Sequence, residues 1–240
     1  MANGAEAKTF VLVHGAWHGG WCWRRVADRL RAGGHTVFTP TLSGVGERSH
    51  QLSGSINLST HITDVVNVLK WEGLTDVVLC GHSYGGMVIT GAADAAAERV
   101  RSLVYLDAFL PQDGERVLDF FPPEALGGLM AGTGSLGGYA LPPVSAERFQ
   151  VNAAGREWVD RLCTPQPLAT FLEAISLTGA HERITERTYI YAEGWAPSGF
   201  TPIYERLKAD PGWTVHSVPC GHDVMVDMPE ELARLLVAAI

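Results

Sequence analysis

Several features are scarce in this 240-residue sequence, and each shortage excludes a class of protein. Charged residues make up only 18% of the chain, and acidic residues outnumber basic ones 26 to 18, which gives a net charge of −8. Nucleic-acid binding requires clustered lysine and arginine, so no nucleic-acid partner is expected. Long apolar runs are also missing: no stretch reaches the roughly 18 residues that span a bilayer, so no membrane insertion is expected.

Cysteine is scarce too, and the chain shows no secretion signal. The four cysteines lie too far apart for a CxxC metal or redox pair, so free thiols are expected. Residues 1–8 lack the basic start and apolar core of a signal peptide, which favours a cytoplasmic location. Hydrophobic residues, in contrast, make up 46% of the chain, enough for one large core and too many for a disordered protein. The cysteines are Cys22, Cys80, Cys163 and Cys220.

Short apolar runs alternate with segments of helical periodicity along most of the chain. Such runs are typical of strands buried on both faces, and the alternation predicts a parallel sheet covered by helices on both sides. The clearest helices are an alanine-rich one over residues 87–97 and a last one that begins at Pro229. The expected strands are residues 9–14, 37–38, 77–80, 103–106, 188–191 and 214–218.

The alternation stops between residues 109 and 187. This stretch has no clear strand, contains a helix-like segment at residues 171–177 and is rich in glycine over residues 127–138. It is too short for us to expect a separate domain with its own core. The pattern therefore predicts a single α/β domain over residues 1–240. A small, mainly helical cap is expected within it as an insertion after the strand that ends near Leu106.

A G-x-S-x-G motif centred on Ser83 follows the third expected strand. This motif marks a nucleophile when it lies between a buried strand and a helix, because the sharp turn exposes the serine at the carboxyl edge of the sheet. Both neighbours are present here. A side chain at Gly81 or Gly85 would collide with the adjacent strand or helix, and Ser83 itself bears the backbone strain. Ser83 is therefore the predicted nucleophile, with a serine in an ordinary turn as the alternative.

A serine hydroxyl needs a base within hydrogen-bond reach. His222 fits best among the nine histidines, because it follows the last strand and comes after the serine in the order Ser, acid, His. The expected oxyanion donors are the backbone N–H groups of Tyr84 and of Ala16, in the loop after the first strand. A zinc site made of His14 and His18 would need a helix that the neighbouring glycines disfavour, so neither a metal nor a cofactor is expected.

The chain resembles the α/β-hydrolase superfamily and, within it, the serine esterase branch related to plant methylesterases and hydroxynitrile lyases. The resemblance covers nearly the whole chain and implies an α/β-hydrolase fold with a sheet of about six parallel strands, flanking helices and a small cap. It also implies the roles already assigned to the nucleophile, the base and the two oxyanion donors. The segments that carry it are residues 10–21, 44–48, 81–86 and 221–222.

Two departures from the plant pattern are informative. Plant lyases carry a lysine directly after the catalytic histidine and a threonine in the first loop, where this chain has Asp223 and Gly15. Cyanohydrin cleavage needs a positive charge near the leaving cyanide, so lyase activity is not expected. The plant position of the triad acid holds no aspartate here, which leaves two candidates. Asp107 is favoured by its place at the carboxyl edge of the sheet, and Glu193 stays open because it lies near the plant position.

The predicted function is that of a serine hydrolase that cleaves small to medium hydrophobic carboxylic esters through an acyl-enzyme. Phe109 and Trp195 are expected to bind the small-molecule ester in a largely apolar pocket, and a homodimer is left open. One alternative is another activity on the same triad, as a thioesterase, lactonase or hydroxynitrile-lyase-like enzyme. Another is a catalytically weak ligand receptor of this fold. Further expected pocket residues are Phe120, Phe121, Leu126, Leu129, Met130 and Phe200.

Overall fold

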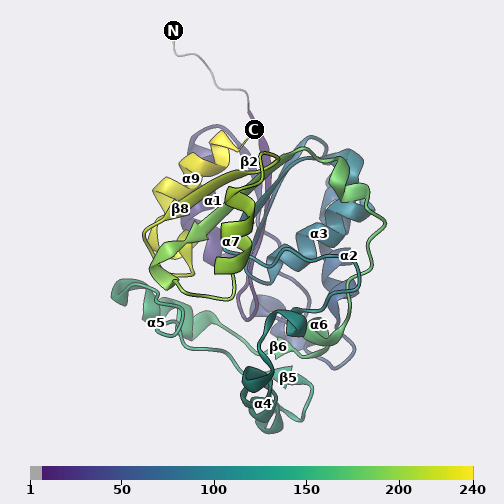
Figure 1. Cartoon of the computed structure of the whole chain (residues 1–240), viewed down its shortest axis with the longest axis vertical. Helices are drawn as coiled ribbons and strands as arrows, with labels where there is room; N and C mark the ends of the chain where they lie inside the picture. Colours follow the sequence, from purple (N-terminus) through teal and green to yellow (C-terminus); the bar gives the residue numbers. More distant parts are fainter. Residues whose placement is uncertain (1–6, 240) are drawn as a thin grey trace.

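A sheet of six parallel strands runs through the middle of the molecule (Figure 1). The computed structural model describes residues 7–239. Its strands are β1 Thr9–Val13, β2 Thr36–Phe38, β3 Val77–His82, β4 Val100–Leu106, β7 Glu186–Ala192 and β8 Thr214–Val218. They follow the order β2-β1-β3-β4-β7-β8 across the sheet, and every pairing is parallel. The fold class and all six expected strands are confirmed.

Helices cover both faces of the sheet. One layer consists of α1 Arg24–Ala32, α8 Val224–Asp227 and α9 Pro229–Ala238, and the other of α2 Leu58–Trp71, α3 Gly85–Ala95 and α7 Thr201–Lys208. Successive side chains of a strand face opposite layers: Phe10 and Leu12 pack in the first, Val11 and Val13 in the second. Because both faces are buried, the strands read as continuous apolar runs. Figure 1 shows α2 and α3 on one side of the sheet and α1 and α9 on the other.

Residues 107–185, between β4 and β7, are called the cap segment here. It contains α4 Pro123–Ala131, β5 Ala140–Leu141, α5 Ala153–Leu162, β6 Gln166–Pro167 and α6 Ala169–Leu172. The sequence predicts no clear strand in this region, and that prediction is wrong, because β5 and β6 pair in antiparallel fashion. Strands of two residues are too short to leave an alternating pattern. Figure 1 shows α4 and β5 at one end of the molecule, away from the sheet.

The helix expected over residues 171–177 is also wrong, since α6 ends at Leu172. The next residue, Glu173, has an extended backbone with φ −74° and ψ 130°. Its carboxylate accepts hydrogen bonds from the Ser59 backbone N–H at 2.7 Å and from Asn57 Nδ2 at 3.1 Å, at the start of α2. This contact between distant parts of the chain overrides the local helical preference.

Three expectations about the whole chain have different outcomes. All four cysteines are free thiols, as predicted. Across residues 7–239, no helix has the length and apolar character that a bilayer span requires. Residues 1–6, which make up most of the region expected to lack a signal peptide, lie outside the described residues.

Candidate active site

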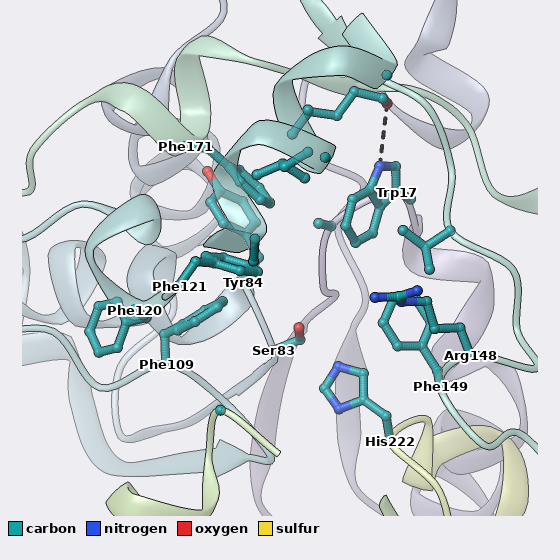
Figure 2. A pocket seen from close by; sticks show the side chains of 18 of the residues that line it. Trp17, Ser83, Tyr84, Phe109, Phe120, Phe121, Arg148, Phe149, Phe171 and His222 are labelled. Atoms are coloured by element: carbon teal, nitrogen blue, oxygen red, sulfur yellow. Dashed lines mark hydrogen bonds between the residues drawn. The ribbon is translucent and has the colours of Figure 1, made fainter. Parts of the chain in front are cut away.

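The residues predicted to act on the substrate line one cavity at the carboxyl ends of the strands (Figure 2). Its volume is about 710 Å³. Ser83 lies just after β3, Ala16 lies in the loop after the neighbouring β1, and His222 lies in the loop after β8. The cap segment contributes further walls through residues such as Phe120 and Pro142. Parallel α/β sheets bind ligands at this edge because the loops that follow the strands meet there.

Ser83 lies in the turn between β3 and α3 with φ +55°. The turn leaves no room for side chains at its glycines. A Cβ at Gly81 would lie 2.5 Å from Gly85 O, and a Cβ at Gly85 would lie 2.8 Å from Val13 O. The Ser83 N–H donates to Leu106 O at 3.2 Å and ties the turn to β4. Figure 2 shows the Ser83 side chain directed into the cavity, as the strained turn requires.

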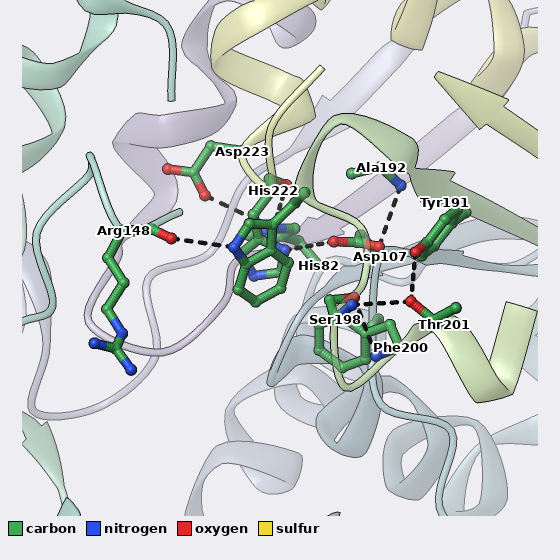
Figure 3. A network of polar contacts seen from close by, with 12 residues as sticks. His82, Asp107, Arg148, Tyr191, Ala192, Ser198, Phe200, Thr201, His222 and Asp223 are labelled. Carbon is green, nitrogen blue, oxygen red and sulfur yellow. Dashed lines mark hydrogen bonds and ion pairs between the residues drawn. The ribbon is translucent and has the colours of Figure 1, made fainter. Parts of the chain in front are cut away.

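The His222 ring donates a short hydrogen bond from Nδ1 to Asp107 Oδ2, with 2.6 Å between the two atoms (Figure 3). Asp107 directly follows β4 with φ +41°, and its Oδ1 accepts the Ala192 N–H at 3.2 Å. Burial raises the pKa of Asp107, and the hydrogen bonds from His222 and Ala192 oppose that rise. Glu193 is exposed in a 3-10 helix, and no hydrogen bond in the described chain joins it to His222. The structure therefore brings Asp107, and not Glu193, to the histidine.

Aromatic rings and backbone contacts hold His222 in the cavity wall. The ring centroid of Trp195 lies 4.4 Å from that of His222, and Phe200 stacks on it at 5.6 Å. The His222 N–H donates to Phe149 O at 2.9 Å, and His82 Nε2 donates to His222 O at 3.0 Å. Because a carbonyl oxygen only accepts, His82 carries its proton on Nε2. Burial holds the pKa of His82 well below its ordinary value, so this ring is neutral.

Ser83 and His222 face the same cavity (Figure 2). Among the described residues no hydrogen bond joins Ser83 Oγ to His222. Ligand-free active sites often hold such pairs apart and bring them together only when substrate binds. The arrangement is therefore compatible with proton transfer between these two residues.

The N–H groups of Ala16 and Tyr84 have no acceptor within residues 7–239. Tyr84 precedes the first turn of α3, where backbone N–H groups lack helical partners. The Ala16 N–H shares a peptide with Gly15 O, which accepts a hydrogen bond from His14 Nδ1 at 2.8 Å. His14 Nε2 in turn accepts the Leu42 N–H at 3.0 Å, so the ring is neutral, and burial lowers its pKa to about 3. His14 thus orients this peptide, a role that the sequence pattern did not reveal.

Trp17 is a second residue that helps to position the loop after β1, and sequence reasoning missed this role. Its backbone has φ +66°, its N–H donates to Gln166 Oε1 at 3.0 Å, and its Nε1 donates to Leu141 O at 3.3 Å. These contacts tie the loop after β1 to the cap segment. The sequence carries no signal for them, since a positive φ is rare for tryptophan and Gln166 lies 149 positions away.

The expected pocket residues are mostly where the sequence predicts them. Phe109 and Trp195 line the cavity together with Phe120, Phe121, Leu129 and Phe200, whereas Leu126 and Met130 are not lining residues. Sequence reasoning missed Phe149, Phe171 and Arg148, of which the last brings a positive charge to an otherwise largely aromatic wall. Figure 2 shows Arg148 and Phe109 on opposite sides of the cavity.

One cluster in the described chain resembles a metal site, because ligand atoms of His82, His222 and Asp223 lie within 4.8 Å of one another. Half of its six donor atoms already have hydrogen-bond partners: His82 Nε2 is bonded to His222 O, His222 Nδ1 to Asp107, and Asp223 Oδ2 to His18. Three atoms have no hydrogen-bond partner among residues 7–239: His82 Nδ1 and Asp223 Oδ1, which are buried, and His222 Nε2. His222 therefore belongs to this cluster as well as to the predicted triad, and the expectation of no metal stays a prediction.

Comparisons with known proteins bear on the fold and the family of the chain. A family model described as Alpha/beta hydrolase family matches residues 10–235. A carbendazim hydrolyzing esterase from Nocardioides sp. (strain SG-4G) is 49% identical over 237 residues, which cover 95% of this chain and 98% of the relative. Methylesterase 7 from Arabidopsis thaliana is 37% identical over 106 residues, which cover 43% of this chain and 41% of the relative.

A solved structure is similar over almost its whole length. It is an extracellular alpha/beta-hydrolase from a Paenibacillus species, described as sharing structural and functional homology with tobacco salicylic acid binding protein 2. Its TM-score is 0.84 at 26% sequence identity, and the match covers 97% of this chain and 98% of that one. The match therefore includes the cap segment as well as the sheet.

Proposed function

Because the chain belongs to the alpha/beta hydrolase family and is an ester-cleaving hydrolase, we propose that it hydrolyses small to medium hydrophobic carboxylic esters through an acyl-enzyme on Ser83. His222 is the base, and Asp107 orients it. The observation that carries this proposal is the 2.6 Å hydrogen bond from His222 Nδ1 to Asp107. It places the ring proton on Nδ1 and leaves Nε2 free to accept the proton of Ser83.

Each half of the reaction transfers one proton through His222. Ser83 Oγ attacks the ester carbonyl carbon while its proton moves to His222 Nε2, and the oxyanion forms beside the N–H groups of Ala16 and Tyr84. His222 then gives that proton to the leaving alkoxide, which departs as an alcohol. Water attacks the acyl group, again losing a proton to His222, and the acid is released as Ser83 regains its hydrogen. Asp107 balances the positive charge that forms on His222 in both halves.

The cavity supports an apolar substrate with an aromatic or alkyl group. Phe109 and Trp195 provide apolar walls of the cavity, and Trp195 lies against the His222 ring. Pockets of this kind bind their ligands by apolar burial and use a few polar groups to fix orientation. A relative at 49% identity is a carbendazim hydrolyzing esterase, so carbendazim is a substrate to test here.

Hydrolysis of p-nitrophenyl acetate by the wild type and by Ser83→Ala tests the proposal. Turnover is expected to fall more than about 1,000-fold in Ser83→Ala, because the nucleophile is lost while the oxyanion donors remain. Ser55→Ala is the matched control and should retain wild-type turnover, because Ser55 is exposed and within residues 7–239 its hydroxyl forms a hydrogen bond only with Ser53. Equal hydrolysis by wild type and Ser83→Ala would refute the acyl-enzyme.

The other candidate activities have distinct signatures in the same preparation. Cyanide release from mandelonitrile would indicate a lyase, and faster turnover of a thioester or lactone than of the ester would change the substrate class. Tight binding of an aromatic ester without turnover would favour a receptor. The cytoplasmic location, the lack of a nucleic-acid partner and the homodimer stay predictions from the sequence, which cell fractionation, a DNA-binding assay and size-exclusion chromatography would check.

A further inference from the structure

A buried histidine, His18, connects two loops of the candidate site. Its Nδ1 donates to Ala16 O at 2.8 Å, and its Nε2 donates to Asp223 Oδ2 at 3.1 Å. Ala16 lies in the loop after β1, whereas Asp223 directly follows His222 in the loop after β8. The two side chains of this pair are 3% and 0% exposed. The contact therefore joins segments 205 positions apart in the sequence, without water between them.

The hydrogen bonds require a proton on both nitrogens of His18. A carbonyl oxygen only accepts, so Nδ1 carries one proton, and Nε2 carries the other because it faces a carboxylate. Burial opposes this charge, but the Asp223 carboxylate outweighs burial and the pKa of His18 is raised. Burial by itself would raise the pKa of Asp223, but His18 lowers it below its ordinary value. The indole of Trp21 stacks on the His18 ring with 5.3 Å between centroids, which also favours a cation.

This pair costs free energy that a hydrophobic contact would not. Moving two charges out of water is expensive, and a well-packed apolar pair of similar volume holds a fold at least as well. Stability alone is thus a weak explanation for the presence of a buried charged pair formed by His18 and Asp223. Neither residue lines the cavity, so neither touches the substrate. What the pair does determine is the separation of the two loops that carry Ala16 and His222.

We infer that His18 and Asp223 are positioning residues, a charged bridge that sets the distance and orientation of the Ala16 N–H relative to His222. The inference rests on the proposed function, in which these two groups act on the same ester carbonyl. In that reaction the Ala16 N–H binds the carbonyl oxygen while His222 transfers the proton, so a displacement of either loop misaligns the reaction without removing a reacting group. A misplacement of about 1 Å in such a site costs on the order of 100-fold in rate. Plant lyases have a lysine where this chain has Asp223, and a lysine there would face the charged His18 with a like charge.

Three variants separate the two contacts of the bridge. His18→Asn keeps an amide N–H in the place of Nδ1, toward Ala16, and loses the contact with Asp223. His18→Gln keeps a donor in the place of Nε2, toward Asp223, and loses the contact with Ala16. Asp223→Asn keeps both connections with a neutral His18, whose Nε2 then accepts the new amide N–H. His181→Asn is the matched control, because His181 forms a comparable 3.0 Å pair with Asp94 outside the cavity lining.

The variants are compared by p-nitrophenyl acetate kinetics, with active sites counted by a fluorophosphonate that labels the serine. Per active site, kcat should fall about 100-fold in His18→Asn and His18→Gln, while KM stays within about threefold. Asp223→Asn should lose less than about tenfold, because the connection is kept. His181→Asn should match the wild type. In ¹⁵N NMR at pH 7, both ring nitrogens of His18 should be protonated in the wild type, and only Nδ1 in Asp223→Asn.

Several results would overturn the bridge. One is wild-type kcat per active site in both His18 variants. A second is a His18 variant in which fewer molecules react with the fluorophosphonate but those that do react have wild-type kcat, because that result indicates a purely structural role. A third is a ¹⁵N NMR spectrum of the wild type in which only one ring nitrogen of His18 is protonated at pH 7. Continued turnover in Ser83→Ala would instead refute the proposed function, so the two failures are distinguishable.

Discussion

Asp107→Asn is the sharpest test of how the histidine is oriented. Asp107 is fully buried, with Oδ1 accepting the Ala192 N–H at 3.2 Å and Oδ2 accepting His222 Nδ1 at 2.6 Å. An asparagine that keeps its oxygen toward Ala192 presents its NH₂ group to His222 Nδ1. Two donors cannot face each other, so the ring must move its proton to Nε2. In that tautomer His222 points an N–H at Ser83 and cannot accept its proton.

The expected loss in kcat is about 10,000-fold, which corresponds to about 5.5 kcal/mol of transition-state stabilisation. Stopped-flow and steady-state hydrolysis of p-nitrophenyl acetate would measure it, and near-ultraviolet circular dichroism would verify folding. Glu193→Gln serves as the control, since Glu193 is exposed and should leave kcat unchanged. Retention of kcat within about tenfold in Asp107→Asn, or a large loss in Glu193→Gln, would refute this reasoning and favour Glu193 as the acid.

Two further predictions concern stability. Burial lowers the pKa values of the His14 and His61 rings to about 3 and about 4. Below pH 6.5 the unfolded chain therefore binds more protons at these rings than the folded chain does. Each ring should lower the free energy of unfolding by about 3 kcal/mol as the pH falls from 6.5 to 4. Urea unfolding at pH 7 and pH 4 checks this, and an acid dependence unchanged in His61→Gln would contradict it. A Cβ at Gly86 would lie 2.1 Å from Phe109 O, so Gly86→Ala should lower the free energy of unfolding by at least about 2 kcal/mol. Gly127→Ala is the control and should leave the free energy of unfolding unchanged, because a Cβ at Gly127 would lie in open space. Equal melting temperatures would disprove it.

The sequence alone determined the architecture, because its signals are local. A strand buried on both faces must be apolar along its whole length, so β1, β3 and β4 could be predicted as strands of a parallel sheet without knowledge of their partners. The turn at Ser83 is equally local, since its conformation depends on glycines within two residues. The fold and ester hydrolysis follow from these patterns and the family from the resemblance of the motifs, and the comparisons confirm all three.

Only the tertiary structure decided which distant groups meet. Asp107 and Glu193 both follow strands, and no local signal says that the first turns toward His222 while the second stays exposed. The short strands β5 and β6 and the early end of α6 likewise depend on partners far along the chain. His18 and Asp223 are 205 positions apart, and each is unremarkable where it stands in the sequence. Their charges stay buried only because the fold places them against each other, since an isolated buried charge would be too costly to keep.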